Sequence, residues 1–222
     1  MRAFETEKTE VAEIDRSVYD IKDKVNAAFE VNSGLTAEIV EQISKEKHDP
    51  DWMREFRLKA LDIYNKASIP NWGPSLEGLD MRNIVTYVRP NTEMRGKWSE
   101  VPDDIKNTFE RLGIPQAERS SLAGVGAQYD SEVVYHNVKE EVAAQGVVYT
   151  DMESALTGPY ADMVKEHFMK CVPPTDHKFA ALHGAVWSGG SFVYVPAGVH
   201  VDIPLQSYFR LNAPGAGQFE HT

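Results

Sequence analysis

The sequence predicts an α+β fold, with a helical region at residues 1–125 and a β-rich region at residues 126–222. In the first region apolar residues recur at spacings of three and four, which is typical of amphipathic helices. From Ser131 onward the spacing becomes strand-like, as in SEVVYHNV. The stretch 179–211 alternates runs of β-branched and aromatic residues with tight corners, which indicates stacked β-structure.

Helical spacing in the first region predicts several helices. Asp51 is a suitable N-cap for one of them, and Pro102 suits the first turn of another. The expected helices cover residues 11–29, 36–49, 52–67, 99–112 and 116–122.

Three basic residues interrupt the wide apolar face of the helix at 52–67. These are Arg54, Arg57 and Lys59. Long basic side chains commonly lay their aliphatic stems on apolar surface and keep their charge in water. We therefore interpret all three as solvated or snorkelling side chains, with a functional basic site as the alternative. One further strand-like run lies within 80–89.

The β-rich region contains several short runs with strand composition. They are found at 132–138, 146–151, 186–187, 192–195 and 205–211. One helix, at 151–171, intervenes, and Gly158-Pro159 is expected to break it. Beyond residue 174 the sequence is expected to be mostly strand.

Charge and composition restrict the class of protein. The formal net charge is −11 with a pI near 5.1, which disfavours nucleic acid as a partner. No apolar run reaches the roughly 18 residues of a membrane span, so a membrane is not expected as a partner either. The charged N-terminus does not resemble a signal peptide, and the single cysteine fits a reducing compartment. We therefore expect a cytoplasmic protein.

One histidine stands in a context that suggests metal binding. The segment Pro196-Ala197-Gly198-Val199-His200 is similar to the second motif of cupins, in which a histidine binds a metal ion. The spacing is one residue short, and the H-x-H pair of a cupin site is absent upstream. A cupin-like metal-binding β protein using His200 is therefore the alternative, and a structural corner residue is the simpler interpretation.

Other candidate groups are weaker. Cys171, His177 and His183 are six residues apart, whereas zinc sites use tighter pairs. Asp176 and Asp202 could join them only if the fold brought them close. Cys171 lacks any neighbouring sequence that would activate a nucleophile, so we expect a buried small hydrophobic residue there.

The glycine-rich segment at 123–127 does not meet the requirements of a phosphate-binding loop. Such a loop needs a preceding strand and a following helix, and here the expected order is reversed. No cluster of titratable residues suggests an active site. We therefore expect no catalytic residue and no metal-binding residue in this chain, and its cofactor-binding residues are unknown from sequence.

Long stretches of the chain resemble one protein family. The matching segments are WMREFRLKALDIYNKASIPNWG (52–73), the segment 101–138, FAALHGAVWSGGSFVYVPAGVHVDIPLQSYFRLN (179–212) and GQFEHT (217–222). They are similar to SufB, the scaffold subunit of SUF iron–sulfur cluster assembly. The third segment also resembles the paralogous SufD, and the second favours SufB.

The resemblance implies a helical N-terminal region followed by the start of a right-handed parallel β-helix. It also implies partners: a SufC-like ATPase, a SufD-like paralogue and the sulfur donor of a cysteine desulfurase system. A member of this family is an assembly scaffold and not an enzyme, and it holds an iron–sulfur cluster transiently. The cluster is expected only for the full-length protein in its complex.

Family members are about twice as long as this chain. Their sulfur-accepting residues and SufC-docking surface lie in the C-terminal half, so we expect an N-terminal fragment with an incomplete β-helix. A third hypothesis, a β-helical binding or carbohydrate-active protein, predicts paired carboxylates or aromatic rows on one face. The sequence does not contain them.

Overall fold

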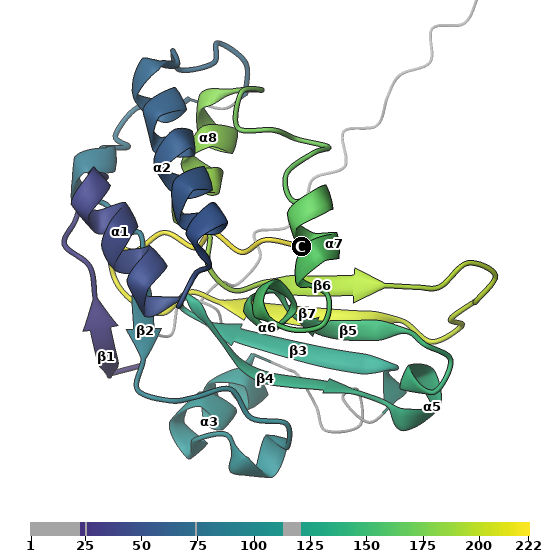
Figure 1. Ribbon diagram of the computed structural model, residues 1–222. Helices are drawn as coiled ribbons and strands as arrows, with labels where there is room; N and C mark the ends of the chain where they lie inside the picture. Colours follow the sequence, from purple (N-terminus) through teal and green to yellow (C-terminus); the bar gives the residue numbers. More distant parts are fainter. Residues whose placement is uncertain (1–22, 25, 74, 113–120) are drawn as a thin grey trace, which may run out of the picture.

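The computed structural model describes residues 23–24, 26–73, 75–112 and 121–222 (Figure 1). The described α-helices are α1 (Ala37–Glu46), α2 (Asp51–Lys66), α3 (Asp103–Arg111), α5 (Glu140–Ala143), α6 (Met152–Thr157), α7 (Ala161–His167) and α8 (Lys178–Val186). The strands are β1 (Ala27–Glu30), β2 (Val88–Pro90), β3 (Gly124–Tyr129), β4 (Glu132–Val138), β5 (Val148–Asp151), β6 (Ser191–Tyr194) and β7 (Leu205–Arg210). Short 3-10 helices occupy Met81–Asn83 and Trp98–Glu100.

The described strands form three small sheets. β1 pairs with β2, and β5 pairs with β6, both antiparallel. The largest sheet has the order β4-β3-β7, in which β3 and β4 form an antiparallel pair. β3 and β7 are parallel, with Gly124 opposite Leu205 and Tyr129 opposite Arg210. A parallel pair requires a long crossover, and here the crossover contains α5–α8 and the β5-β6 pair.

A helical layer, in which α2 lies between α1 and α8, forms one end of the molecule (Figure 1). α2 and α8 approach closely because Gly184 of α8 lies against Ala60 of α2. Their shared core also includes Ile43, Leu61 and Leu182, all buried. The helices near the N-terminus therefore complete their core with residues from the β-rich region.

The sequence predictions for the first region are confirmed in large part. α1 and α3 lie within the predicted helices at 36–49 and 99–112, and α2 matches the helix predicted at 52–67 to within one residue at each end. Pro50, not Asp51, is the N-cap of α2. The helix predicted at 11–29 is wrong at its end, because Ala27–Glu30 is strand β1, and residues 11–22 lie outside the described part. Most of the helix predicted at 116–122 also lies outside it.

The main error in the β-rich region concerns residues 179–187. We predicted the run at 186–187 as strand, but α8 extends through Val186. The ring of His177 caps this helix, since its Nδ1 accepts hydrogen bonds from the backbone N–H groups of Phe179 and Ala180, both at 3.1 Å. α8 is apolar and buried around most of its circumference, so its sequence lacks the period that separates helix from strand.

The expectation of mostly strand beyond residue 174 is also wrong, because α8 and irregular segments occupy most of this stretch and the strands there are β6 and β7. Most other predictions of this region are confirmed. β4, β5, β6 and β7 lie at the predicted strand runs, allowing a residue or two at the ends. α6 and α7 replace the single helix predicted at 151–171, with the break at Gly158 as expected. The division at residue 125 and the parallel β-helix stay predictions. Within the described residues, no helix has the length and apolar character to cross a membrane.

The glycine-rich segment forms the buried strand β3 and not a loop. A side chain at Gly124 would lie 2.6 Å from Cδ1 of Tyr149 and 2.9 Å from Cδ2 of Leu205. Its neighbour Gly126 faces the hydroxyl of the same tyrosine. The glycines therefore allow β5 and β7 to pack closely around β3.

Replacing Gly124 with Ala is expected to lower the free energy of unfolding by about 1–3 kcal/mol, because the new methyl group overpacks this contact. Urea unfolding followed by circular dichroism measures the change. Gly96→Ala is the matched control, since a methyl group there meets no atom within 4 Å. Equal midpoints for the two variants would show that β3 does not need glycine.

Candidate functional site

A buried arginine of α2 pairs with an aspartate just before that helix and also contacts the segment that follows α8. The side chains of Arg57 and Asp49 are both fully buried, and Arg57 Nε donates to Asp49 Oδ2 at 2.6 Å. Arg57 Nη1 also donates to the carbonyl of Trp187 at 2.8 Å, and the guanidinium lies 4.6 Å from the centre of that indole ring. The interpretation of Arg57 as solvated is therefore wrong. Periodicity could not reveal this, because a buried arginine needs a partner from elsewhere in the fold.

A second buried polar network surrounds Lys47 at the C-terminal end of α1. Its Nζ donates to both oxygens of Glu132 at 2.9 Å and contacts Glu153 Oε1 at 2.7 Å. Glu153 also accepts a hydrogen bond from the Gly189 backbone N–H at 2.6 Å, and the Tyr87 hydroxyl donates to Glu132. Burial raises the pKa of Glu153, and the Lys47 ammonium more than offsets this, so the pKa lies below its usual value. One ammonium group thus connects α1, β4 and α6.

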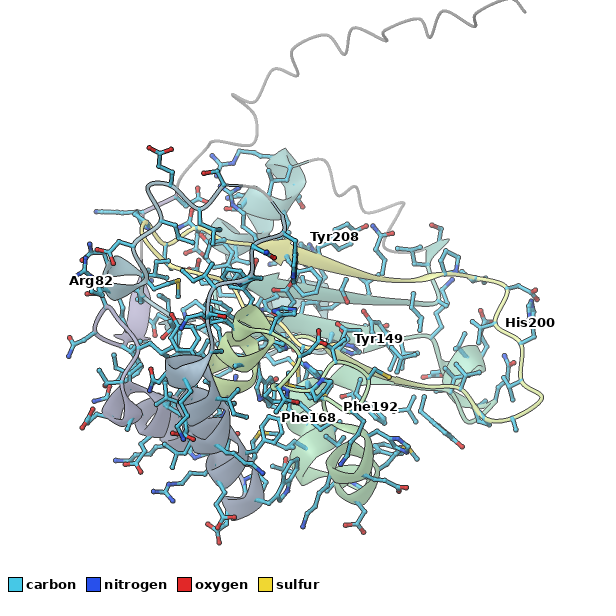
Figure 2. All side chains as sticks on the ribbon, turned by 90° about the horizontal axis from the view of Figure 1, so that it is seen from above. Arg82, Tyr149, Phe168, Phe192, His200 and Tyr208 are labelled. Carbon is cyan, nitrogen blue, oxygen red and sulfur yellow. The ribbon has the colours of Figure 1, made fainter. Side chains whose placement is uncertain are left out.

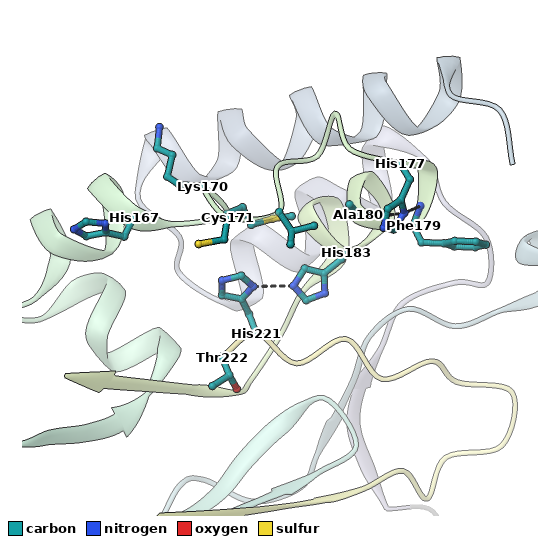
Figure 3. A pocket seen from close by; sticks show the side chains of 11 residues that line it. His167, Lys170, Cys171, His177, Phe179, Ala180, His183, His221 and Thr222 are labelled. Carbon is teal, nitrogen blue, oxygen red and sulfur yellow. Dashed lines mark hydrogen bonds between the residues drawn. The ribbon is translucent and has the colours of Figure 1, made fainter. Parts of the chain in front are cut away.

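A cavity of about 470 Å³ opens between α8, the segment after α7 and the segment that ends at Thr222 (Figure 3). Most of its wall is apolar, with imidazole, ammonium and thiol groups among the lining side chains. Its lining residues are His167, Met169, Lys170, Cys171, Val172, His177, Phe179, Ala180, His183, His221 and Thr222. We take this cavity as the candidate site because four histidines and a cysteine thiol line it together.

Two histidines form a hydrogen-bonded pair in the wall of this cavity. His183 Nε2 and His221 Nδ1 are 2.8 Å apart, so one ring donates and the other accepts (Figure 3). The ring of His221 also packs on Phe168, with 4.3 Å between ring centres. Burial, then the neighbouring His183 and Arg57, lower the pKa of His221 to about 4. Burial followed by Arg57 lowers the pKa of His183. Both rings are therefore neutral at pH 7.

The predicted candidates Cys171, His177 and His183 all line this cavity. Cys171 is exposed, so the expectation of a buried residue is wrong. Asp176 lies beside His177, with 3.8 Å between Oδ2 and Nε2. His221, which comes 38 residues after His183, was missed because the sequence gives no sign of their contact.

His200 lies far from the cavity. Figure 2 shows it at the tip of the loop between β6 and β7, away from the body of the molecule. Its side chain is 84% exposed, and its Nε2 is 3.1 Å from Asp202 Oδ1. Among the described residues, no group of three or more His, Cys, Asp or Glu side chains is placed to hold a metal ion. The geometry therefore gives no support to a cupin-like site.

Acid is expected to destabilise the fold through the His183–His221 pair. The folded-state pKa of His221, about 4, lies below its ordinary value of 6.5, so the unfolded chain takes up a proton first. The contribution of the neutral histidine pair to the free energy of unfolding is present above pH 6.5 and is lost as the pH falls toward 4. Urea unfolding at a series of pH values measures this, and His221→Gln is expected to flatten the dependence in that window. His200→Gln, at an exposed position, should keep the original slope.

Comparison with known proteins places these features in a family. Residues 37–207 match the family model described as "SufBD protein N-terminal region". The chain belongs to the SufBD family. It is 53% identical over 204 residues to the "Iron-sulfur cluster assembly protein SufB" of Bacillus subtilis, a match that covers 92% of this chain and 44% of that protein.

Other SufBD relatives give the same result. An "Iron-sulfur cluster assembly SufBD family protein" of Mycobacterium tuberculosis is 48% identical over 218 residues, which cover 98% of this chain and 26% of the relative. One of Staphylococcus haemolyticus is 50% identical over 204 residues, covering 92% of this chain and 44% of the relative. The chain thus spans less than half the length of these SufBD proteins. The family resemblance inferred from the sequence is confirmed.

Proposed function

We propose that this chain supplies the N-terminal part of a SufB-type scaffold for iron–sulfur cluster assembly. The observation that carries the proposal is the 53% identity with the B. subtilis protein over 92% of the chain. In this role the chain contributes a folded support, and the cluster is cargo that is held transiently by the complete protein. The scaffold itself is not an enzyme, and it works in the cytoplasm.

The proposal includes the architecture and the partners. The β-rich region would be the start of a right-handed parallel β-helix, and two features support this. β3 and β7 pair in parallel, and Gly190 forms a parallel bridge with His221. The partners would be a SufC-like ATPase, a SufD-like paralogue and the sulfur donor of a cysteine desulfurase system.

A chimera tests the function directly. Residues 37–207 of this chain would replace the matching segment of B. subtilis SufB in cells that depend on that protein. If this segment is SufB-type, growth and the activity of iron–sulfur enzymes are retained. A SufC-like and a SufD-like subunit should also co-purify with the affinity-tagged chimera.

The control separates misfolding from a different function. A second chimera would carry Val125→Asp, which places a charge in the buried strand β3 and is expected to fail through misfolding. A first chimera that is folded and abundant but supplies no clusters and binds neither subunit would contradict the proposal.

A further inference from the structure

The paired histidines of the cavity suggest a second chemical role that does not rest on the proposed function. We propose that His183 and His221 are the two protein ligands of a site for a borderline divalent metal ion such as Zn²⁺. Neutral imidazole is a preferred ligand for such ions. His200, the histidine of the cupin-like segment, is not part of this site, because it lies at the tip of a distant loop (Figure 2).

The spacing of the two rings is close to what a shared metal ion requires. Zinc binds imidazole nitrogen at about 2.0–2.1 Å, so two ligands at a tetrahedral angle have nitrogens about 3.3 Å apart. His183 Nε2 and His221 Nδ1 are 2.8 Å apart. For a metal ion to replace their hydrogen bond, the two nitrogens therefore need to separate by about 0.5 Å, and both rings need to turn so that their lone pairs point to the metal.

The proton balance of this exchange is simple. In the neutral pair one ring nitrogen carries the shared proton, and the other offers its lone pair. When the metal ion enters, the donor ring changes to its other tautomer and both lone pairs point to the metal. The imidazoles of the neutral pair therefore release no net proton in this exchange.

The surrounding charges permit a cation. The Lys170 ammonium lines the same cavity and opposes metal binding, and so does the nearby guanidinium of Arg57. Its charge is compensated by the ion pair with Asp49 at 2.6 Å. The chain as a whole has a formal net charge of −11, which favours the approach of a cation.

The cavity provides space for the remaining coordination positions. The described residues do not place a third ligand side chain ready to hold the ion, so water fills the open positions in the first bound state. Cys171 is exposed in the same cavity. Its thiol can add as a thiolate, with loss of one proton, if its side chain turns toward the histidine pair.

The test is a titration of the purified chain with Zn²⁺ by calorimetry and with Co²⁺ by visible absorption. One equivalent should bind. His183→Ala and His221→Ala should each weaken metal binding by at least about 10- to 100-fold. Loss of a hydrogen-bond partner of a metal ligand has an effect of that size, and loss of the ligand itself should be no smaller. His200→Ala is the matched control and should bind like the unchanged chain.

A second measurement avoids dependence on variants that fold poorly. In the unchanged chain, nitrogen-15 resonances of both imidazole rings should shift on addition of one equivalent of Zn²⁺, and Cys171→Ser should retain the one-to-one stoichiometry. The proposal is overturned if the chain binds no metal, if these ring resonances stay in place, or if Cys171→Ser abolishes binding while both histidine variants retain it.

Discussion

Replacing Asp49 with Ala is expected to lower the free energy of unfolding by about 3–5 kcal/mol, because it leaves the Arg57 guanidinium buried without its anion. The guanidinium cannot turn to solvent, since its side chain is fully buried and it donates to the carbonyl of Trp187. Chemical unfolding followed by tryptophan fluorescence measures the loss directly, because Trp187 lies against this group.

Two control variants distinguish the buried pair from ordinary surface charge. Arg54 is on the same helix and pairs with Glu41, but both side chains are about half exposed. Arg54→Ala is therefore expected to change stability by no more than about 1 kcal/mol. The double variant Asp49→Leu with Arg57→Met should recover much of the loss, because an apolar pair leaves no buried charge. A similar small effect for Asp49→Ala and Arg54→Ala would contradict this account.

Replacing Lys47 with Met is the second large effect, with an expected loss of about 3–5 kcal/mol at pH 7. The substitution preserves most of the side-chain volume but removes the ammonium group from Glu132 and Glu153. Both carboxylates then lose their cation, and Glu153 is left with the hydrogen bond from the backbone of Gly189. Lys66→Met is the matched control, because the Lys66–Asp62 pair is exposed.

The stability of the Lys47→Met variant should change with pH in the direction opposite to the contribution that this network makes in the unchanged chain. In the unchanged chain the pKa of Glu153 is lowered, so its contribution to stability is present above the ordinary value of 4.5 and is lost as the pH falls. Without Lys47 the dominant effect is burial, which raises the pKa of Glu153. The variant should therefore lose stability as the pH rises above about 4.5. Equal loss at pH 5 and pH 8 would show that the network is not electrostatic.

Amphipathic elements with one partly solvated face were predictable from sequence. α1 carries apolar residues at helical spacing and lies within the predicted helix, and β4 coincides with the predicted strand run at 132–138. α8 was not predictable in this way. It is buried around most of its circumference, so its apolar run fits a strand as well as a helix until α2 is known to pack against it.

The candidate site depends even more on long-range contacts. Cys171, His177 and His183 could be singled out from sequence as chemically versatile residues, and they do line one cavity. Their partner His221 is contributed by a distant segment that pairs in parallel with the residues around Gly190. Local sequence determines which residues could act, whereas the tertiary path of the chain determines which of them meet.

The contacts of Arg57 also have a consequence for synthesis of the protein on the ribosome. The carbonyls that it binds belong to Ala185 and Trp187, which follow it by 128 and 130 residues. At elongation rates of about 5–20 residues per second, roughly 6–25 s pass between the synthesis of Arg57 and the synthesis of these two residues. During that interval Arg57 and the apolar surface of α2 have no tertiary partner from α8. The nascent N-terminal helices are thus a natural target for chaperones that bind apolar segments.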